Sequence, residues 1–228
     1  MEKITEIEKI TQDKNRNNLS KVWGKTKIFI SNYYLYISFI LIIVIGSILS
    51  PLFLNPINII NVLLQNSVFT IIAIGQLFVI LTAGIDLSVG SIVALSASLI
   101  AGFLQGGISP VLAILIVIIV AGITGSISGT IISYGKVAPF IVTLSMMSIV
   151  RGIAYIYQTG ADRRIYNMDF INGVAGQIKG IPLPIIYMFL LALLMNFILR
   201  RTVFGRAVYA IGGNMETCRL AGIRVNFF

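Results

Sequence analysis

Two long segments without a single charged residue dominate this chain, one from Ile28 to Ile85 and the other from Leu87 to Gly135. Asp86 is the only charge between them. Charged residues make up 11% of the 228-residue chain and hydrophobic residues 57%, whereas roughly a quarter of a soluble domain is charged. The core of a soluble 228-residue protein could not bury so much apolar surface. Lipid must therefore be the solvent for most of the chain.

Six segments are long and apolar enough to cross the ~30 Å hydrocarbon core, which takes roughly 20 residues of α-helix. All prolines fall in connections or in first helical turns, where a missing N–H costs least. A transmembrane barrel would instead alternate apolar and polar residues. The sequence therefore predicts an all-α polytopic membrane protein with about six transmembrane helices, at about residues 28–49, 59–82, 87–105, 111–134, 137–158 and 183–199.

The Lys and Arg residues lie almost entirely in the polar segments. Residues 1–27 hold seven of them, the turn at Lys136 one and residues 200–228 five, whereas the segment between the fifth and sixth spans holds three. The positive-inside rule then predicts a cytoplasmic tail at 1–27, a membrane domain at 28–199, and both ends of the chain in the cytoplasm. The net charge of +9 does not predict a nucleic-acid partner, because no basic face interleaved with aromatics accompanies it. A single Cys and no His predict no metal site.

Asp86 lies in the sequence TAGIDLSVGS, between the second and third predicted spans. Gly84 and Gly90 permit backbone conformations that other residues resist. Asp86 or Ser88 can accept a hydrogen bond from the free N–H groups that open the next helix, where a negative charge is also favoured. Two interpretations stay open. One is a tight cytoplasmic turn with a helix cap, and the other is a break in the bundle whose irregular backbone lines a polar route.

Three ordered stretches cover most of the chain from about residue 55 onward: GIDLSVGS at 84–91, APFIVTLSMMSIVRGIAYIYQTG at 138–160 and FGRAVYAIGGNMETCRLAGIRV at 204–225. Together they resemble the sugar-type permeases of ATP-binding cassette (ABC) importers, the ribose-transport permease family. The resemblance implies a bacterial inner-membrane permease, without enzymatic chemistry or a cofactor, that imports a ribose-like monosaccharide. It implies three partners: a second permease copy, an ABC ATPase that binds the ATP, and a periplasmic or lipid-anchored sugar-binding protein.

The third stretch predicts a short helix after the sixth span. Asn214 is a good N-cap, Glu216 lies in the first turn where its charge suits the helix dipole, and Gly222 can end the helix after Ala221. So short a helix is unstable alone in water and must dock on its own bundle or on a partner. The resemblance identifies residues 200–228 as the coupling loop that contacts the ATPase, with candidate coupling residues Gly205, Arg206, Gly212, Gly213, Asn214, Glu216, Arg219 and Gly222.

Arg151 is the only charge inside a predicted span. At about 1.5 Å per residue it lies ~21 Å along that span from Val137, towards the outer leaflet. It is either an interfacial anchor or a residue beside the exit of the sugar from the binding protein. Thr143, Ser145 and Ser148 on the same span carry hydroxyls that suit an uncharged polyol, so these four residues form the candidate translocation path. Small hydroxyl residues are also common where membrane helices pack.

A secondary transporter or channel without an ATPase is the main alternative, and acidic residues inside the membrane would support it. Asp86 is its one acidic candidate, which weakens it. The permeases that the chain resembles form a bundle of about ten helices, with about four more spans of roughly 20 residues after the coupling loop. We therefore expect an incomplete chain, through truncation, a frameshift or separate encoding of the second half. A permease fragment that does not transport by itself is a further alternative.

Overall fold

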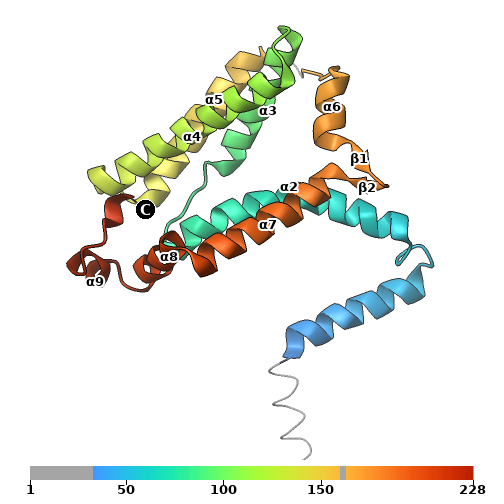
Figure 1. Cartoon of the computed structure of the whole chain (residues 1–228), viewed down its shortest axis with the longest axis horizontal. Coiled ribbons are helices and arrows are strands. Elements are labelled where there is room, and N and C mark those ends of the chain that lie inside the picture. The colour runs from blue at the N-terminus through green and yellow to red at the C-terminus, as the bar shows by residue number, and fades with distance from the viewer. Residues whose placement is uncertain (1–32, 160–162, 228) are drawn as a thin grey trace, which may run out of the picture. The chain divides into compact units, whose positions relative to one another are not determined.

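The computed structural model describes residues 33–159 and 163–227 (Figure 1). The predicted cytoplasmic tail and the first residues of the first predicted span lie outside this part. The chain divides into two compact units, Met1–Ile59 and Ile60–Phe228. The described part of the first unit contains the apolar helix Tyr33–Leu49 and the turn that follows it.

Within the described residues, four helices are long and apolar enough to cross a membrane: α2 (Pro56–Leu81), α4 (Pro110–Gly135), α5 (Pro139–Gln158) and α7 (Leu183–Arg201). The helix Tyr33–Leu49 and α3 (Val89–Gln105) are apolar but shorter, at 17 residues each. Prolines occupy the first turns of α4, α5 and α7, as the sequence predicts. Most large apolar side chains on these helices are exposed, which suits helices that face lipid. The chain is an all-α polytopic membrane protein.

The helices α3, α4 and α5 pack together in the second unit (Figure 1). Leu95 of α3 packs against Met146, Val150 and Ala154 of α5 to form the core of this group. A polar contact adds to it, because Gln158 Nε2 at the end of α5 donates a hydrogen bond to Ser98 Oγ on α3. A side-chain hydrogen bond between membrane helices contributes about 0.6 kcal/mol, so apolar packing dominates this helix pair.

Gly102 allows α5 to approach α3 closely. A Cβ at this position would overlap the Tyr157 hydroxyl. Arg163 contacts the same residue, since its guanidinium carbon lies 4.9 Å from the ring centroid and its Nη2 donates to the Tyr157 backbone carbonyl oxygen at 3.0 Å. Displacing the ring would disturb this cation–π contact.

We expect Gly102→Ala to lower the thermal unfolding midpoint of the purified chain by several degrees, because overpacking costs about 1–3 kcal/mol. Tyr157→Leu in the same chain should restore most of the loss by removing the overlapping hydroxyl. Gly122→Ala on α4 is the matched control, since nothing lies within 4 Å of its added Cβ. Equal melting of the Gly102 and Gly122 variants would contradict this close approach.

A short helix and a hairpin connect α5 and α7, and the sequence analysis predicted neither. The helix is α6 (Met168–Ala175), and strand β1 (Gln177–Ile178) pairs antiparallel with β2 (Ile181–Pro182). The two residues between the strands, Lys179 and Gly180, have φ angles of 51° and 81°. Two consecutive positive φ angles define the type I′ turn that two-residue hairpins favour.

Residues 200–228 were predicted to be a loop with one short helix, but they contain two α-helices. These are α8 (Val203–Gly213) and α9 (Met215–Leu220), followed by the 3-10 turn η1 (Val225–Phe227). Thr202 caps α8 by accepting a hydrogen bond from the Gly205 N–H at 3.2 Å. The sequence analysis missed α8 because it contains three glycines, each costing about 1 kcal/mol of helix propensity. Tertiary contacts overcome this cost.

Candidate functional site

The connection between α2 and α3 is longer than the tight turn that the sequence analysis considered. Helix α2 ends at Leu81 and α3 begins at Val89, and residues 84–88 between them form neither helix nor strand (Figure 1). The two helices therefore do not meet directly. Irregular backbone of this kind is tolerated at membrane depth only where it faces protein or a water-filled cavity.

A left-handed residue ends α2, and that residue is Ala83 rather than Gly84. Ala83 has φ 59° and its N–H donates to the Ile80 carbonyl, while the Gly84 N–H donates to the Val79 carbonyl at 2.8 Å. These two bonds form a Schellman motif. Gly84 is needed for space, since a Cβ there would lie 3.0 Å from a methyl of Val79. Gly90 has neither a positive φ nor a close neighbour.

Asp86 organises the segment that leads into α3. Its Oδ1 accepts hydrogen bonds from the Ser88 N–H at 2.7 Å and from Ser88 Oγ at 2.6 Å. Ser88 is the N-cap residue of α3 but makes no side-chain capping bond. Of the two predicted cap residues, Asp86 accepts a backbone N–H, that of Ser88, whereas Ser88 has helical backbone angles (φ −79°, ψ −17°) instead of the extended angles of a typical N-cap. Gln76 Nε2 on α2 donates to the Asp86 carbonyl at 2.9 Å, which ties the segment back to α2.

Helix α8 packs directly against the C-terminal end of α2. A Cβ at Gly212 would overlap the carbonyl oxygen of Leu81, so the contact brings backbone against backbone. Close by, the rings of Phe78 on α2 and Phe204 on α8 have centroids 6.1 Å apart and are tilted by 43°. The predicted coupling segment is thus in contact with the last residue of α2. The irregular residues 84–88, here called the Asp86 segment, follow shortly after it.

Gly205 makes a second close approach, at the corner between α7 and α8. A Cβ there would overlap the Leu199 carbonyl and would lie 2.5 Å from the Ile198 carbonyl oxygen. Two of the predicted coupling residues, Gly205 and Gly212, are therefore positions where only glycine fits. No signal in the sequence distinguishes them from Gly213, whose added Cβ would meet nothing within 4 Å.

Helix α9 begins after the predicted N-cap Asn214 and ends at Leu220, one residue before the predicted Ala221. Asn214 Oδ1 accepts a hydrogen bond from the Thr217 N–H at 2.9 Å, and Gly222 follows the helix with φ 81°. Glu216 and Arg219 form an ion pair of 3.1 Å whose side chains are 66% and 57% exposed. Because exposed pairs contribute only about 0–1 kcal/mol, these charges, with the exposed Arg206 of α8, are available to a partner surface.

A cavity of about 770 Å³, here called the turn cavity, lies between the Asp86 segment and the helices α8 and α9. Thr143 on α5 lines it and is buried, with its hydroxyl donating to the Pro139 carbonyl at 2.9 Å. Its charged lining residues come from three separate parts of the chain and are Asp86, Lys136 and Arg219. Its lining also includes the small residues Gly125, Ser128 and Gly129 of α4. Residues far apart in the sequence thus line one cavity that combines charged and apolar side chains.

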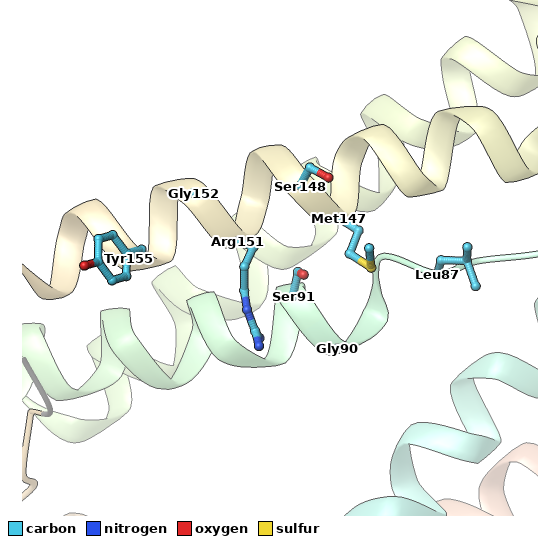
Figure 2. Close-up of a pocket in the computed structure, with 8 residues that line it drawn as sticks. All are labelled: Leu87, Gly90, Ser91, Met147, Ser148, Arg151, Gly152 and Tyr155. Carbon is cyan, nitrogen blue, oxygen red and sulfur yellow. The ribbon is translucent and has the colours of Figure 1, made fainter. Parts of the chain in front are cut away.

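A second hollow of about 630 Å³, the α3–α5 groove, lies between those two helices (Figure 2). It brings the start of α3 together with the second half of α5 and is lined by Leu87, Gly90, Ser91, Met147, Ser148, Arg151, Gly152 and Tyr155. In Figure 2 the Arg151 side chain extends from α5 across to α3, next to Ser91.

The four residues predicted to line one path on α5 do not share one surface. Ser148 and Arg151 line the α3–α5 groove, whereas Thr143 lines the turn cavity. Ser145 lines neither, and its hydroxyl donates to the Ile141 carbonyl at 2.9 Å. The reason is helical geometry, because at 3.6 residues per turn Ser145 points roughly opposite to Thr143.

Sequence reasoning missed five of the eight lining residues of the α3–α5 groove: Leu87, Ser91, Met147, Gly152 and Tyr155. Two signals could have found Ser91 and Tyr155. Ser91, Leu95 and Ser98 are buried at helical spacing along α3, which marks the face turned to α5. Tyr155 lies one helical turn after Arg151 on the same face. Among the described residues, no three His, Cys, Asp or Glu side chains lie close enough to hold a metal ion.

Comparison with known proteins finds relatives over most of the chain. The ribose import permease protein RbsC of Bacillus subtilis (strain 168) is 43% identical over 192 residues, which cover 83% of this chain and 60% of that protein. The D-allose transport system permease protein AlsC of Escherichia coli (strain K12) is 35% identical over 224 residues, or 98% of this chain and 67% of that protein. The L-arabinose ABC transporter permease protein AraH of Azospirillum brasilense is 37% identical over 175 residues, or 77% of this chain and 52% of that protein.

The chain thus spans about 60% of the length of ribose permeases that it matches. No solved structure matches it. Residues 58–228 match the family described as branched-chain amino acid transport system / permease component. The family match includes the Asp86 segment, the α3–α5 pair and the helices α8 and α9. This chain belongs to that permease family, in the branch of its sugar ABC permeases.

Proposed function

We propose that this chain is the transmembrane permease subunit of an ABC importer for a sugar, with a ribose-like monosaccharide as the first candidate. The named activities of the ribose, D-allose and L-arabinose permeases support this substrate class. The chain would act in the bacterial inner membrane, with both ends cytoplasmic, as the excess of Lys and Arg in its terminal segments predicts. It would perform no covalent chemistry. A second permease copy, an ABC ATPase and a sugar-binding protein would complete the importer.

The backbone contact between Gly212 and Leu81 is the observation that carries this proposal. Helices α8 and α9 carry exposed charges at Arg206, Glu216 and Arg219, and α8 contacts the end of α2 through Gly212. The Asp86 segment starts directly after that end. Because backbone atoms in contact cannot yield as a flexible side chain does, a partner that pushes on α9 would displace the segment as well.

The turn cavity lies next to these contacts. Arg219 of α9 and Asp86 line the same cavity, together with Thr143 of α5. A shift of α8 and α9 against α2 would change the shape of the cavity. This is how closure of an ATPase would open or close a route for a sugar in the membrane.

Glu216→Lys tests the partner surface. The substitution opposes the dipole of α9 at its first turn, by about 0.3–1 kcal/mol in each direction, and it places a cation beside Arg219. In a full-length permease that carries this segment, we expect about tenfold less ATPase to co-purify, with the permease still inserted in the membrane.

Asp169→Lys is the matched control. Asp169 is also the acidic residue in the first turn of a short helix, α6, but α6 lies in the segment predicted to be on the opposite side of the membrane. This variant should retain the ATPase. Equal recovery of the ATPase with both variants would contradict docking through α9.

A further inference from the structure

Arg151 is a cation without a protein partner inside the described part of the chain. No hydrogen bond or ion pair of its side chain occurs among the described residues, and the side chain is exposed in the α3–α5 groove. Its five N–H donors form a planar fork. A charged group within a membrane helix is costly and is retained where it faces protein, water or a ligand. Among the described residues, Arg151 therefore faces water or a ligand in the groove.

The groove around Arg151 combines hydroxyls, an aromatic ring and open space. Ser148 Oγ donates to the Leu144 carbonyl at 3.2 Å, which leaves its lone pairs free to accept. Ser91 is only 4% exposed and forms the polar part of the α3 wall. The Tyr155 side chain is 69% exposed and lies one turn beyond Arg151 (Figure 2).

The glycines of the groove leave room for a ring-shaped ligand. Nothing lies within 4 Å of a Cβ added at Gly90 or at Gly152, on the two opposing helices. Small-molecule sites usually measure about 300–1,000 Å³, and the groove of about 630 Å³ lies within this range.

The charges of the groove favour a neutral ligand. No carboxylate lines it, so a cationic ligand would find no partner. Arg151 is also its only cation, and phosphate groups are usually held by several cations or backbone N–H groups. A polyol needs donors and acceptors together, with an apolar surface against its C–H face. Arg151, the two serines and Tyr155 provide this combination.

We propose that the α3–α5 groove is a subsite for an uncharged monosaccharide. Arg151 donates to neighbouring sugar hydroxyls, Ser91 and Ser148 accept from others, and the ring of Tyr155 covers the apolar face of the sugar. The proposal rests on the proposed function, because it assigns the sugar of the importer to a place in this chain. The groove is open and its few hydrogen bonds compete with water, so the sugar binds weakly and leaves easily.

Protection of a cysteine from labelling tests the subsite in the purified chain, without an ATPase. In a Cys218→Ala background, Gly152→Cys places a thiol in the groove, and Ser145→Cys places one on the same helix outside it. With the chain in lipid nanodiscs, we expect saturating D-ribose to slow maleimide labelling at position 152 at least threefold and to leave position 145 unchanged. Adding Arg151→Leu should remove the protection, and Arg151→Gln serves if the leucine variant does not fold.

Three results separate the possible errors. No protection at position 152, while a complete importer carrying this segment takes up ribose, would overturn the subsite and leave the proposed function intact. Protection by inorganic phosphate but not by ribose would overturn the sugar assignment in favour of an anion, such as a lipid headgroup. Protection that Arg151→Leu and Arg151→Gln do not change would overturn the role of Arg151.

Discussion

Gly212→Ala should separate α8 from the end of α2 and destabilise the chain, although alanine is the better helix former. Its Cβ would overlap the carbonyl oxygen of Leu81, which is backbone and cannot rotate away. Overpacking of this kind costs about 1–3 kcal/mol, against a gain of about 1 kcal/mol in helix propensity. We expect the thermal unfolding midpoint of the purified chain to fall by several degrees. In a complete importer carrying this segment, sugar uptake should fall at least tenfold, because the coupling contact is lost.

Gly213→Ala is the control for the stability measurement. It makes the same chemical change one residue later in α8, where nothing lies within 4 Å of the added Cβ. The midpoint of this variant should stay the same or rise. If both alanine variants melt alike, the backbone contact between α8 and α2 does not exist in the protein.

Asp86→Ala should have the second large effect. The buried Ser88 would keep its N–H and its hydroxyl without their shared acceptor, and each buried donor left unpaired costs about 1–3 kcal/mol. The start of α3 and the lining of the turn cavity would both lose their order. We expect a lower unfolding midpoint for the purified chain and a loss of most sugar uptake in a complete importer.

Asp86→Asn distinguishes the hydrogen bonds from the charge. Asparagine presents the same carbonyl-type oxygen to Ser88, so this variant should keep most of the stability and most of the uptake. A well-inserted Asp86→Asn protein that loses uptake as completely as Asp86→Ala would show that the negative charge itself is required. That result would favour an ion-coupled role for Asp86.

The sequence by itself determined the all-α membrane fold and some of the local helix ends. Uncharged segments of about 20 residues can be solvated only by lipid, so the long apolar helices were predictable to within a few residues. Asn214 and Gly222 were also correctly read as the ends of α9, because caps depend on hydrogen bonds within one or two turns. The resemblance of three stretches to sugar permeases depended on the sequence alone.

Only the tertiary structure decided which small and polar residues carry the site. Glycine is needed at positions 102, 205 and 212 because backbone or side-chain atoms from other parts of the fold lie close to them. The sequence alone does not show which atoms will lie there. Ser88, one of the two predicted cap residues, makes no side-chain cap because its backbone has helical angles, which the sequence does not reveal. The hydroxyls of α5 were distributed between a groove and a cavity by the packing of its neighbours. Helix propensity and solvation by lipid depend on neighbouring residues in the chain, whereas contacts between distant segments form only in the folded protein.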